Sequence, residues 1–94
     1  MTTLNLNQRS YISLYDLEDT LPAEAITEIC FTECNEAACV RWVVKLNVQI
    51  PRAICKEALL DYGYEQSDIN SLDFAELQCR MVWLAAWNRY DRGY

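Results

Sequence analysis

The stretch Met81-Val82-Trp83-Leu84-Ala85-Ala86-Trp87 is apolar at every position and lies near the end of the 94-residue chain. It belongs to a longer segment, residues 73–90, that we predict to be a helix. Asp73 with Glu76 three residues later resembles a capping box, with Asp in the place of Ser or Thr. A helix that is apolar all round its middle is buried on several sides. The sequence therefore predicts that this helix lies at the centre of the molecule.

Two apolar stripes run along the predicted helix. One repeats at helical spacing and consists of Phe74, Leu77, Met81 and Leu84; the other consists of Trp83, Trp87 and Tyr90. Each buried aromatic ring removes on the order of 150–250 Å² from water. The three tryptophans of the chain are therefore expected to supply much of the core.

A second helix is predicted over residues 51–62. Pro51 stands at its start, a position where the missing N–H of proline costs nothing. Gly63 ends it, because glycine readily adopts the left-handed conformation that closes many helices. Residues 64–70 are mostly polar, and we expect them to form a link to the last helix.

Residues 25–50 are predicted to form a β-hairpin. In its second half the apolar residues fall on even positions with polar residues between them, as a half-buried strand requires. These positions are Val40, Trp42, Val44, Leu46, Val48 and Ile50. The alternative is a helix over residues 36–46, in which Arg41 and Lys45 would be neighbours one turn apart. We favour the strand because consecutive β-branched residues lose side-chain freedom in a helix.

These elements together predict an α+β fold. A small antiparallel β-sheet, the hairpin of about residues 25–50, would pack against two or more helices, about residues 51–62 and 73–90. The sheet face that carries Trp42 and Val44 would lie against the last helix.

The N-terminal segment leaves two structures open. Tyr11 and Tyr15 would share a face of a helix, but Tyr11, Ser13 and Tyr15 also alternate as in a strand. Residues 16–20 then form an acidic stretch that we expect to be exposed, ended by Leu21-Pro22. Aromatic residues beside charges are typical of binding hot spots, although the two tyrosines would equally serve to cover the core.

The length and composition predict one domain, residues 1–94, inside the cytoplasm. A hydrophobic content of 52% is too high for a disordered chain. No apolar run approaches the ~18 residues that span a bilayer, and the N-terminus lacks the pattern of a signal peptide. The five cysteines are odd in number, and no two form a Cys-x-x-Cys pair. Free thiols in a reducing compartment explain them best.

The negative charge is concentrated in the first forty residues. The whole chain has a net charge of −6, and residues 1–40 contain seven acidic side chains against one basic side chain. Such a surface would steer a basic protein partner and argues against direct binding to nucleic acid. A simpler alternative is that the charge only keeps the protein soluble. The predicted partner-binding residues are Tyr11, Tyr15, Asp16, Glu18, Asp19, Glu24, Glu28, Glu33 and Glu36.

The sequence argues against the common catalytic chemistries, and we predict no cofactor and no metal. Histidine is absent, which excludes Ser-His-Asp and Cys-His arrangements, and two glycines cannot build a phosphate loop. Asp16, Glu18 and Asp19 are near enough in sequence for a magnesium ion, but solvated side chains explain them better. Cys30 and Cys34 lie among glutamates, which disfavour a thiolate. A four-cysteine zinc site would match no common spacing.

We therefore predict a non-enzymatic acidic protein that acts as a stoichiometric inhibitor of a basic, nucleic-acid-binding complex. In size, charge and lack of motifs the chain resembles inhibitors carried by phages and other mobile elements, including anti-CRISPR and anti-restriction proteins. The resemblance is one of profile and transfers no site residue. An antitoxin or immunity protein would have the same profile. A structural subunit that self-associates, for example as a homodimer, is the alternative from another class.

Overall fold

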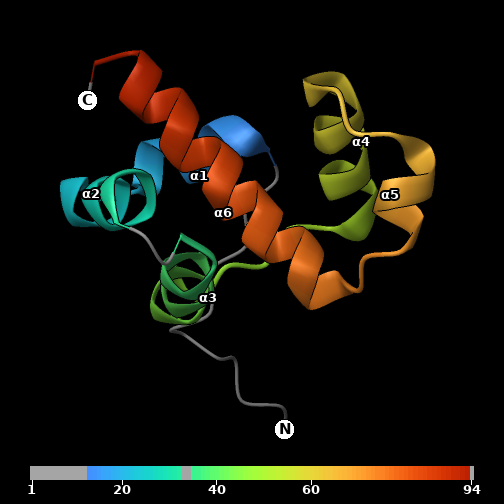
Figure 1. Ribbon diagram of the computed structural model, residues 1–94, viewed down its shortest axis with the longest axis horizontal. Coiled ribbons are helices and arrows are strands. Elements are labelled where there is room, and N and C mark those ends of the chain that lie inside the picture. Colours follow the sequence, from blue (N-terminus) through green and yellow to red (C-terminus); the bar gives the residue numbers. More distant parts are fainter. Residues whose placement is uncertain (1–12, 33–34, 94) are drawn as a thin grey trace, which may run out of the picture.

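The computed structural model describes residues 13–32 and 35–93 of the chain (Figure 1). Every regular element of these residues is a helix, so the predicted α+β fold with a hairpin over residues 25–50 is wrong. The helices are α1 (Leu14–Thr20), α2 (Ala23–Phe31), α3 (Asn35–Leu46), α4 (Arg52–Tyr62), α5 (Gln66–Asn70) and α6 (Phe74–Asp91).

Helix α6 occupies the centre of the molecule, as its apolar middle predicted. It crosses the molecule diagonally in Figure 1 and packs against α1, α2, α3 and α4. Its start is the predicted capping box: the Glu76 N–H donates to Asp73 Oδ1 at 2.8 Å, and the Asp73 N–H donates to Glu76 Oε1 at 3.1 Å. Its fully buried side chains include Leu77, Met81 and Leu84, three of the four members of the first predicted stripe, whereas the fourth, Phe74, is half-buried.

Helix α4 agrees closely with the helix predicted over residues 51–62. Gly63 closes it in a left-handed conformation with φ of 123°. The Gly63 N–H donates to the Leu60 carbonyl at 3.1 Å, and the Tyr64 N–H donates to the Leu59 carbonyl at 3.0 Å. This pair of bonds is the Schellman arrangement that satisfies the last carbonyls of a helix. The link that follows contains the short helix α5, which Ile69 anchors in the core.

Helix α3 replaces the predicted second strand. Residues spaced three and four apart, Ala38, Cys39 and Trp42, form its buried face, whereas Val44 is 72% exposed. The alternation of apolar residues therefore does not mark the core-facing side, and Val44 does not face α6 as predicted. Each β-branched residue costs a helix at most about 0.7 kcal/mol, which burial of a large apolar side chain outweighs.

An asparagine ends α3 in the manner of a glycine. Asn47 has a φ of 53°, in the left-handed region that asparagine tolerates better than most residues. The Asn47 N–H donates to the Val44 carbonyl at 3.1 Å, and the Val48 N–H donates to the Val43 carbonyl at 3.0 Å. The same Schellman closure therefore ends α3 and α4. The chain then continues through residues 48–51 in a link without helical structure.

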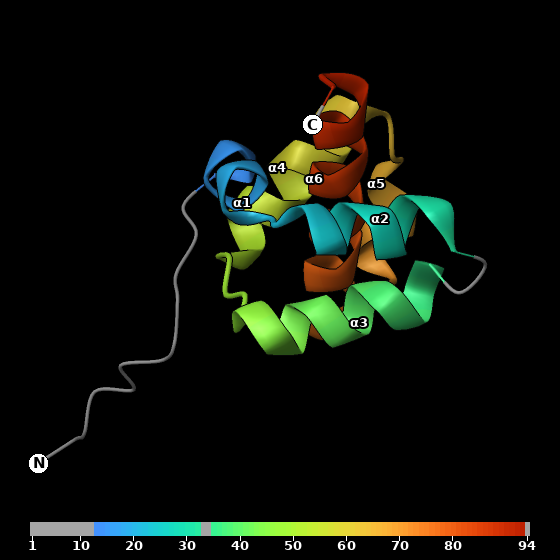
Figure 2. The same cartoon turned by 90° about the vertical axis from the view of Figure 1, so that its left-hand side faces the viewer.

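Helix α2 replaces the predicted first strand. It buries Ala25, Ile26 and Ile29 and lies beside α3, with the two helices running in opposite directions (Figure 2). At the start of the described chain, Ser13 caps α1 by accepting a hydrogen bond from the Asp16 N–H at 3.1 Å. The helical alternative thus holds from Ser13 onward, while residues 10–12 lie outside the described part of the chain.

Candidate functional site

Seven of the nine predicted partner-binding residues fall in the described part of the chain, while Tyr11 and Glu33 lie outside it. The seven occupy three helices: Tyr15, Asp16, Glu18 and Asp19 on α1, Glu24 and Glu28 on α2, and Glu36 on α3. Their surroundings differ, so they do not act as one uniform acidic face.

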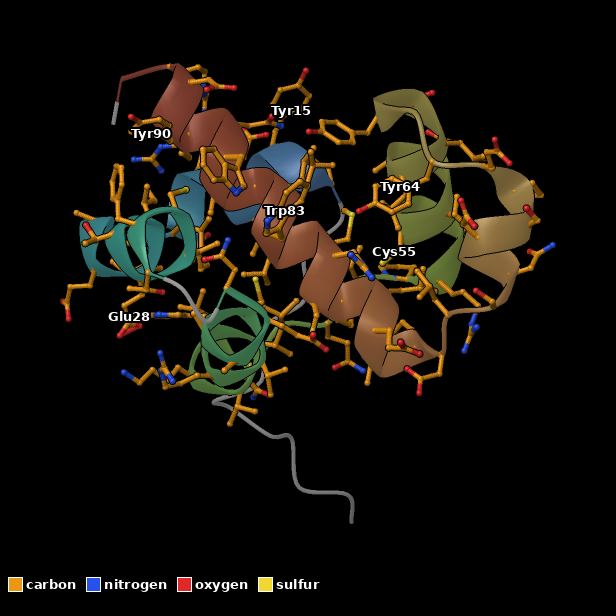
Figure 3. The ribbon with its side chains drawn as sticks, in the orientation of Figure 1. Tyr15, Glu28, Cys55, Tyr64, Trp83 and Tyr90 are labelled. Carbon is orange, nitrogen blue, oxygen red and sulfur yellow. The ribbon has the colours of Figure 1, made fainter. Side chains whose placement is uncertain are left out.

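The outward face of α1 brings three of these residues together. Tyr15, Asp16 and Asp19 are all exposed, and they lie opposite the buried Leu17 and Glu18. Tyr15 is 72% exposed and stands at the periphery of the molecule (Figure 3). An exposed aromatic ring and two acidic side chains therefore share this face of α1.

Glu18, in contrast, points into the molecule, so the exposure predicted for the whole stretch of residues 16–20 is wrong at this position. Its Oε1 lies 2.7 Å from Arg92 Nη2, and Asn88 Nδ2 donates to its Oε2 at 3.0 Å. The Arg89 guanidinium donates to the backbone carbonyls of Glu18 and Leu21. The end of α6 thus holds the end of α1, and the Glu18 charge is satisfied within the chain.

Glu28 connects α2 to α3. Trp42 Nε1 donates to its carboxylate, and Arg41 Nη2 lies 3.5 Å from the same oxygen, Oε2. The indole hydrogen bond, with the charges of Arg41 and Lys45, lowers the pKa of Glu28 below its usual value and outweighs the partial burial that would raise it. Glu28 is therefore a charged interhelical contact rather than a side chain free for a partner.

The two remaining acidic residues are exposed on separate helices. Glu24 lies in the first turn of α2, and Glu36 lies in the first turn of α3. A carboxylate is favourable at both places because the N-terminus of a helix carries a partial positive charge. Glu36 also lines a groove between α3 and α6.

A row of aromatic rings crosses α6, and none of its members is among the predicted partner-binding residues. Successive ring centroids are 5.0–6.4 Å apart, within the range at which aromatic pairs attract. The aromatic row consists of Phe31, Tyr90, Trp87, Trp83, Tyr62 and Tyr64. Figure 3 shows Tyr64, Trp83 and Tyr90 along this side of α6. The second predicted stripe of α6, which consists of Trp83, Trp87 and Tyr90, was the sequence signal for this row. These side chains lie on the outer side of the core and do not pack against a sheet.

Several members of the aromatic row remain accessible to solvent. Phe31, Tyr62 and Tyr90 are exposed, and Trp83 and Trp87 are half-buried. Contiguous apolar surface of this kind is typical of sites that contact another molecule. Aromatic side chains are also over-represented among the residues that dominate binding energy.

A groove with a volume of about 340 Å³ adjoins the aromatic row, between the first turns of α3 and the first half of α6. Apolar side chains from both helices contribute to its lining: Cys39 and Val40 from α3, and Cys79 and Trp83 from α6. The volume is near the lower end of the ~300–1,000 Å³ range of ligand pockets and is suited to one or two side chains.

Charged residues form the rim of this groove. Glu36, Asp73 and Glu76 supply three carboxylates, and Arg80 supplies one positive charge. The Arg80 guanidinium lies over the ring of Tyr64, 5.9 Å from its centroid. Within residues 13–32 and 35–93, none of the three carboxylates has a basic group at ion-pair distance.

The cysteines of the described chain are poor nucleophiles. Burial raises the pKa of the Cys39 thiol to about 12 and that of Cys55 to about 11, and it also raises the pKa values of Cys30 and Cys79. The thiolate is the reactive form of cysteine, so these side chains pack as small apolar groups at neutral pH.

The described residues contain no group of three or more Cys, Asp or Glu side chains placed to hold a metal ion. The carboxylates considered for magnesium diverge, since Glu18 points toward Arg92 while Asp16 and Asp19 lie on the outward face of α1. In the part of the chain that the structure describes, no helix has both the length and the apolar character required to cross a membrane.

Comparisons with protein-family models, with curated proteins and with solved structures give no match to this chain. The case for a function therefore depends on the surfaces themselves.

Proposed function

We propose that the protein is a non-catalytic, acidic binding protein that docks stoichiometrically on a basic protein surface. The observation that carries the proposal is the outward face of α1, where the exposed ring of Tyr15 shares one surface with the exposed side chains of Asp16 and Asp19. A tyrosine offers a large contact area with few rotatable bonds. The neighbouring charges would orient a cationic partner and select it over acidic surfaces.

The charge of the whole chain supports the same proposal. Glu18 and Glu28 pair with Arg92 and Arg41, but each of these pairs uses one acid and one base. Internal pairing therefore leaves the net charge of −6 unchanged, and the excess is carried by the exposed carboxylates. A protein with this excess attracts basic partners over a distance of about one Debye length, ~8–10 Å in ordinary buffers.

Inhibition of a nucleic-acid-binding complex is the specific form that we propose for this binding. Exposed carboxylates would occupy a groove that otherwise receives phosphates, as expected for an inhibitor of the anti-CRISPR or anti-restriction type. Only part of the phosphate field needs to be matched, because a duplex presents a negative charge about every 1.7 Å along its axis.

The test is a pull-down from the native host at low and at high salt, using the wild-type protein and two charge variants. D16N/D19N neutralises the outward face of α1. E57Q/D61N removes the same number of charges from exposed positions on α4. We expect the wild type and the α4 variant to capture one stoichiometric partner at low salt and to release it at high salt. D16N/D19N should capture little of that partner.

Equal capture by all three proteins, or capture that high salt does not weaken, would contradict the proposal. Thermal melts of the three proteins show whether each is folded. Asp16 lies in the first turn of α1, where loss of its charge costs at most about 1 kcal/mol, so the D16N/D19N variant should still fold.

Self-association is a second candidate function, and the exposed aromatic row favours it. Phe31 and Tyr62, near opposite ends of this row, would be covered in a dimer. Sedimentation velocity at low and high protein concentration tests this alternative. A concentration-dependent dimer that F31S/Y62S abolishes, and that D16N/D19N leaves intact, would support self-association over docking on a basic partner.

A further inference from the structure

The groove between α3 and α6 combines apolar walls with an acidic rim. Val40 is 47% exposed on one side, and the indole of Trp83 is half-buried on the other. Exposed apolar walls that face each other across a groove gain free energy when a side chain fills the space between them. The chemistry of the occupant is then decided by the rim.

The rim attracts positive charge even when the positive charges beside it, those of two helix N-termini and of Arg80, are included. The N-termini of α3 and α6 both lie at the groove, and each contributes a partial charge of roughly +0.5. Glu36, Asp73 and Glu76 contribute three negative charges against the one charge of Arg80. The carboxylates therefore outweigh the helix ends, and an anionic or phosphate-bearing occupant is disfavoured.

We propose that this groove receives an arginine side chain of the basic partner. The inference rests on the proposed function and names the partner chemistry that it recognises. The aliphatic stem of the arginine would lie against Val40 and Cys39, and its planar guanidinium would stack on Trp83. The guanidinium N–H groups would donate to Glu36 and Glu76 at the rim.

Arginine fits this groove better than lysine for two physical reasons. A guanidinium is planar and weakly hydrated, so it stacks on an indole at a lower desolvation cost than an ammonium group. Its N–H groups also donate in pairs to a carboxylate, which a point charge cannot do. The groove volume of about 340 Å³ accommodates such a side chain with a neighbouring residue.

This groove and the outward face of α1 are separate surfaces. In Figure 2, α1 and the start of α3 lie at opposite sides of the molecule. Substitutions in one therefore leave the other intact, and the two proposals can fail independently.

The experiment is an NMR titration of the full ¹⁵N-labelled chain with a probe peptide, acetyl-Gly-Arg-Leu-Arg-Gly-amide. The controls on the ligand side are the same peptide with citrulline, the neutral isostere of arginine, and with lysine. E36Q/E76Q neutralises the rim while glutamine at position 76 can still complete the capping box of α6. E57Q/D61N on α4 makes the same change of charge away from the groove.

We expect saturable shifts of the Trp83 indole N–H and of backbone amides at the starts of α3 and α6. E36Q/E76Q should bind the arginine peptide about tenfold more weakly, whereas E57Q/D61N should match the wild type. Lysine should bind more weakly than arginine, and citrulline should not bind.

Equal affinity of wild type and E36Q/E76Q, equal binding of the citrulline peptide, or shifts confined to other surfaces would overturn the arginine site. Binding of the lysine peptide at least as tight as that of the arginine peptide would also overturn it. If the arginine peptide behaves as expected but the pull-down shows no role for the face of α1, the proposed docking surface fails and the groove stands. If the pull-down depends on the face of α1 but the arginine peptide does not bind as expected, the arginine site fails and the proposed docking surface remains.

Discussion

The two halves of α6 hold their neighbours by different chemistry. In the first half, the buried side chain of Gln78 clamps the link between α3 and α4: the Ile50 N–H donates to Gln78 Oε1 at 3.0 Å, and Gln78 Nε2 donates to the Ile50 carbonyl at 2.7 Å. At the other end, Glu18 of α1 meets Arg92, the residue directly after α6, whose side chain is 54% exposed. One contact is neutral and enclosed, and the other is charged and reaches solvent.

The difference follows from the cost of burying polar groups. A buried backbone N–H or carbonyl without a partner costs about 1–3 kcal/mol, and a single amide satisfies both groups of Ile50 without adding charge. An ion pair is tolerable at the other end because Arg92 keeps much of its hydration. Enclosed contacts should therefore dominate stability, and contacts that reach the surface should contribute less.

The largest effect is expected from Q78A. The substitution leaves the N–H of Ile50 unpaired inside the core, leaves its carbonyl with only the weak hydrogen bond from the Cys55 thiol at 3.7 Å, and opens a small cavity. We expect a loss of about 2–4 kcal/mol in the free energy of unfolding, a large share of the ~5–15 kcal/mol of an ordinary domain. Urea denaturation followed by tryptophan fluorescence measures it.

Q66A is the matched control for this substitution. Gln66 is exposed on α5 and donates to Asn70 Oδ1 at 2.9 Å. Its replacement should change stability by no more than ~0.5 kcal/mol, as at most surface positions. If Q78A and Q66A had the same effect, the enclosed amide would not hold the link, and the comparison between the two ends of α6 would lose its basis.

An intermediate effect on stability is expected at the ion pair of Glu18 and Arg92, and the two partners should differ in how much stability their replacement costs. R92A leaves the carboxylate of Glu18 buried without its cation, and we expect a loss of about 1–2 kcal/mol. E18Q only releases Arg92 into water, and its amide can still accept a hydrogen bond from Asn88. R92A should therefore lower the free energy of unfolding more than E18Q does, although Arg92 is the more exposed of the two residues.

Denaturant midpoints of R92A, E18Q and R52A test this order. Arg52 is also exposed, and its guanidinium lies 5.5 Å from the ring centroid of Phe74. R52A thus reports the cost of losing an exposed arginine without stranding an acid. A larger loss for E18Q than for R92A would show that the Glu18 charge is not the group that needs a partner.

The smallest effect concerns Glu28 and depends on pH. Its folded-state pKa lies below the ordinary value of 4.5, chiefly because Trp42 donates to the carboxylate, so the unfolded chain takes up the proton first as the pH falls. The stabilisation is thus complete above pH 4.5 and is lost as the pH falls through the lowered pKa. E28Q should melt at a lower temperature than the wild type at neutral pH, and the difference should shrink as the pH falls below 4.5 and through the lowered pKa of Glu28.

E57Q is the control, because Glu57 is exposed in the middle of α4, away from a helix N-terminus and from the contacts of Glu28. It should track the wild type across the whole pH range. A difference between E28Q and the wild type that stays constant from neutral to acidic pH would mean that the contact of Glu28 with Trp42 and Arg41 does not depend on the charge of the carboxylate.

The parts of the fold that depend on neighbouring residues were predictable from the sequence. The capping box of Asp73 and Glu76 and the closure at Gly63 are local arrangements of a few residues, and the structure contains both. The predicted hairpin is wrong because the helical spacing of Ala38, Cys39 and Trp42, and not the alternation from Val40 to Ile50, marks the buried side of this segment. Asn47 is a stop signal for the helical alternative, because asparagine tolerates the left-handed conformation that closes a helix.

The candidate surfaces were predictable only in part. The sequence singled out Tyr15, Asp16 and Asp19, which share a face of α1. The sequence could not separate them from Glu18. Which of these neighbouring side chains is buried depends on which side of α1 packs against the rest of the molecule. The aromatic stripe of α6 was visible as a pattern, but whether it is covered depends on which elements pack against it.

The sequence by itself determined the central helix, its caps, the position of α4 and the excess of negative charge, because each depends on residue types at short separations. Only the tertiary structure decided that α2 and α3 are helices, that Glu18 and Glu28 pair with Arg92 and Arg41, and that a groove opens between α3 and α6. The physical reason is that burial against distant segments contributes more free energy than local propensity. A short amphipathic stretch therefore takes the conformation that its neighbours in space can cover.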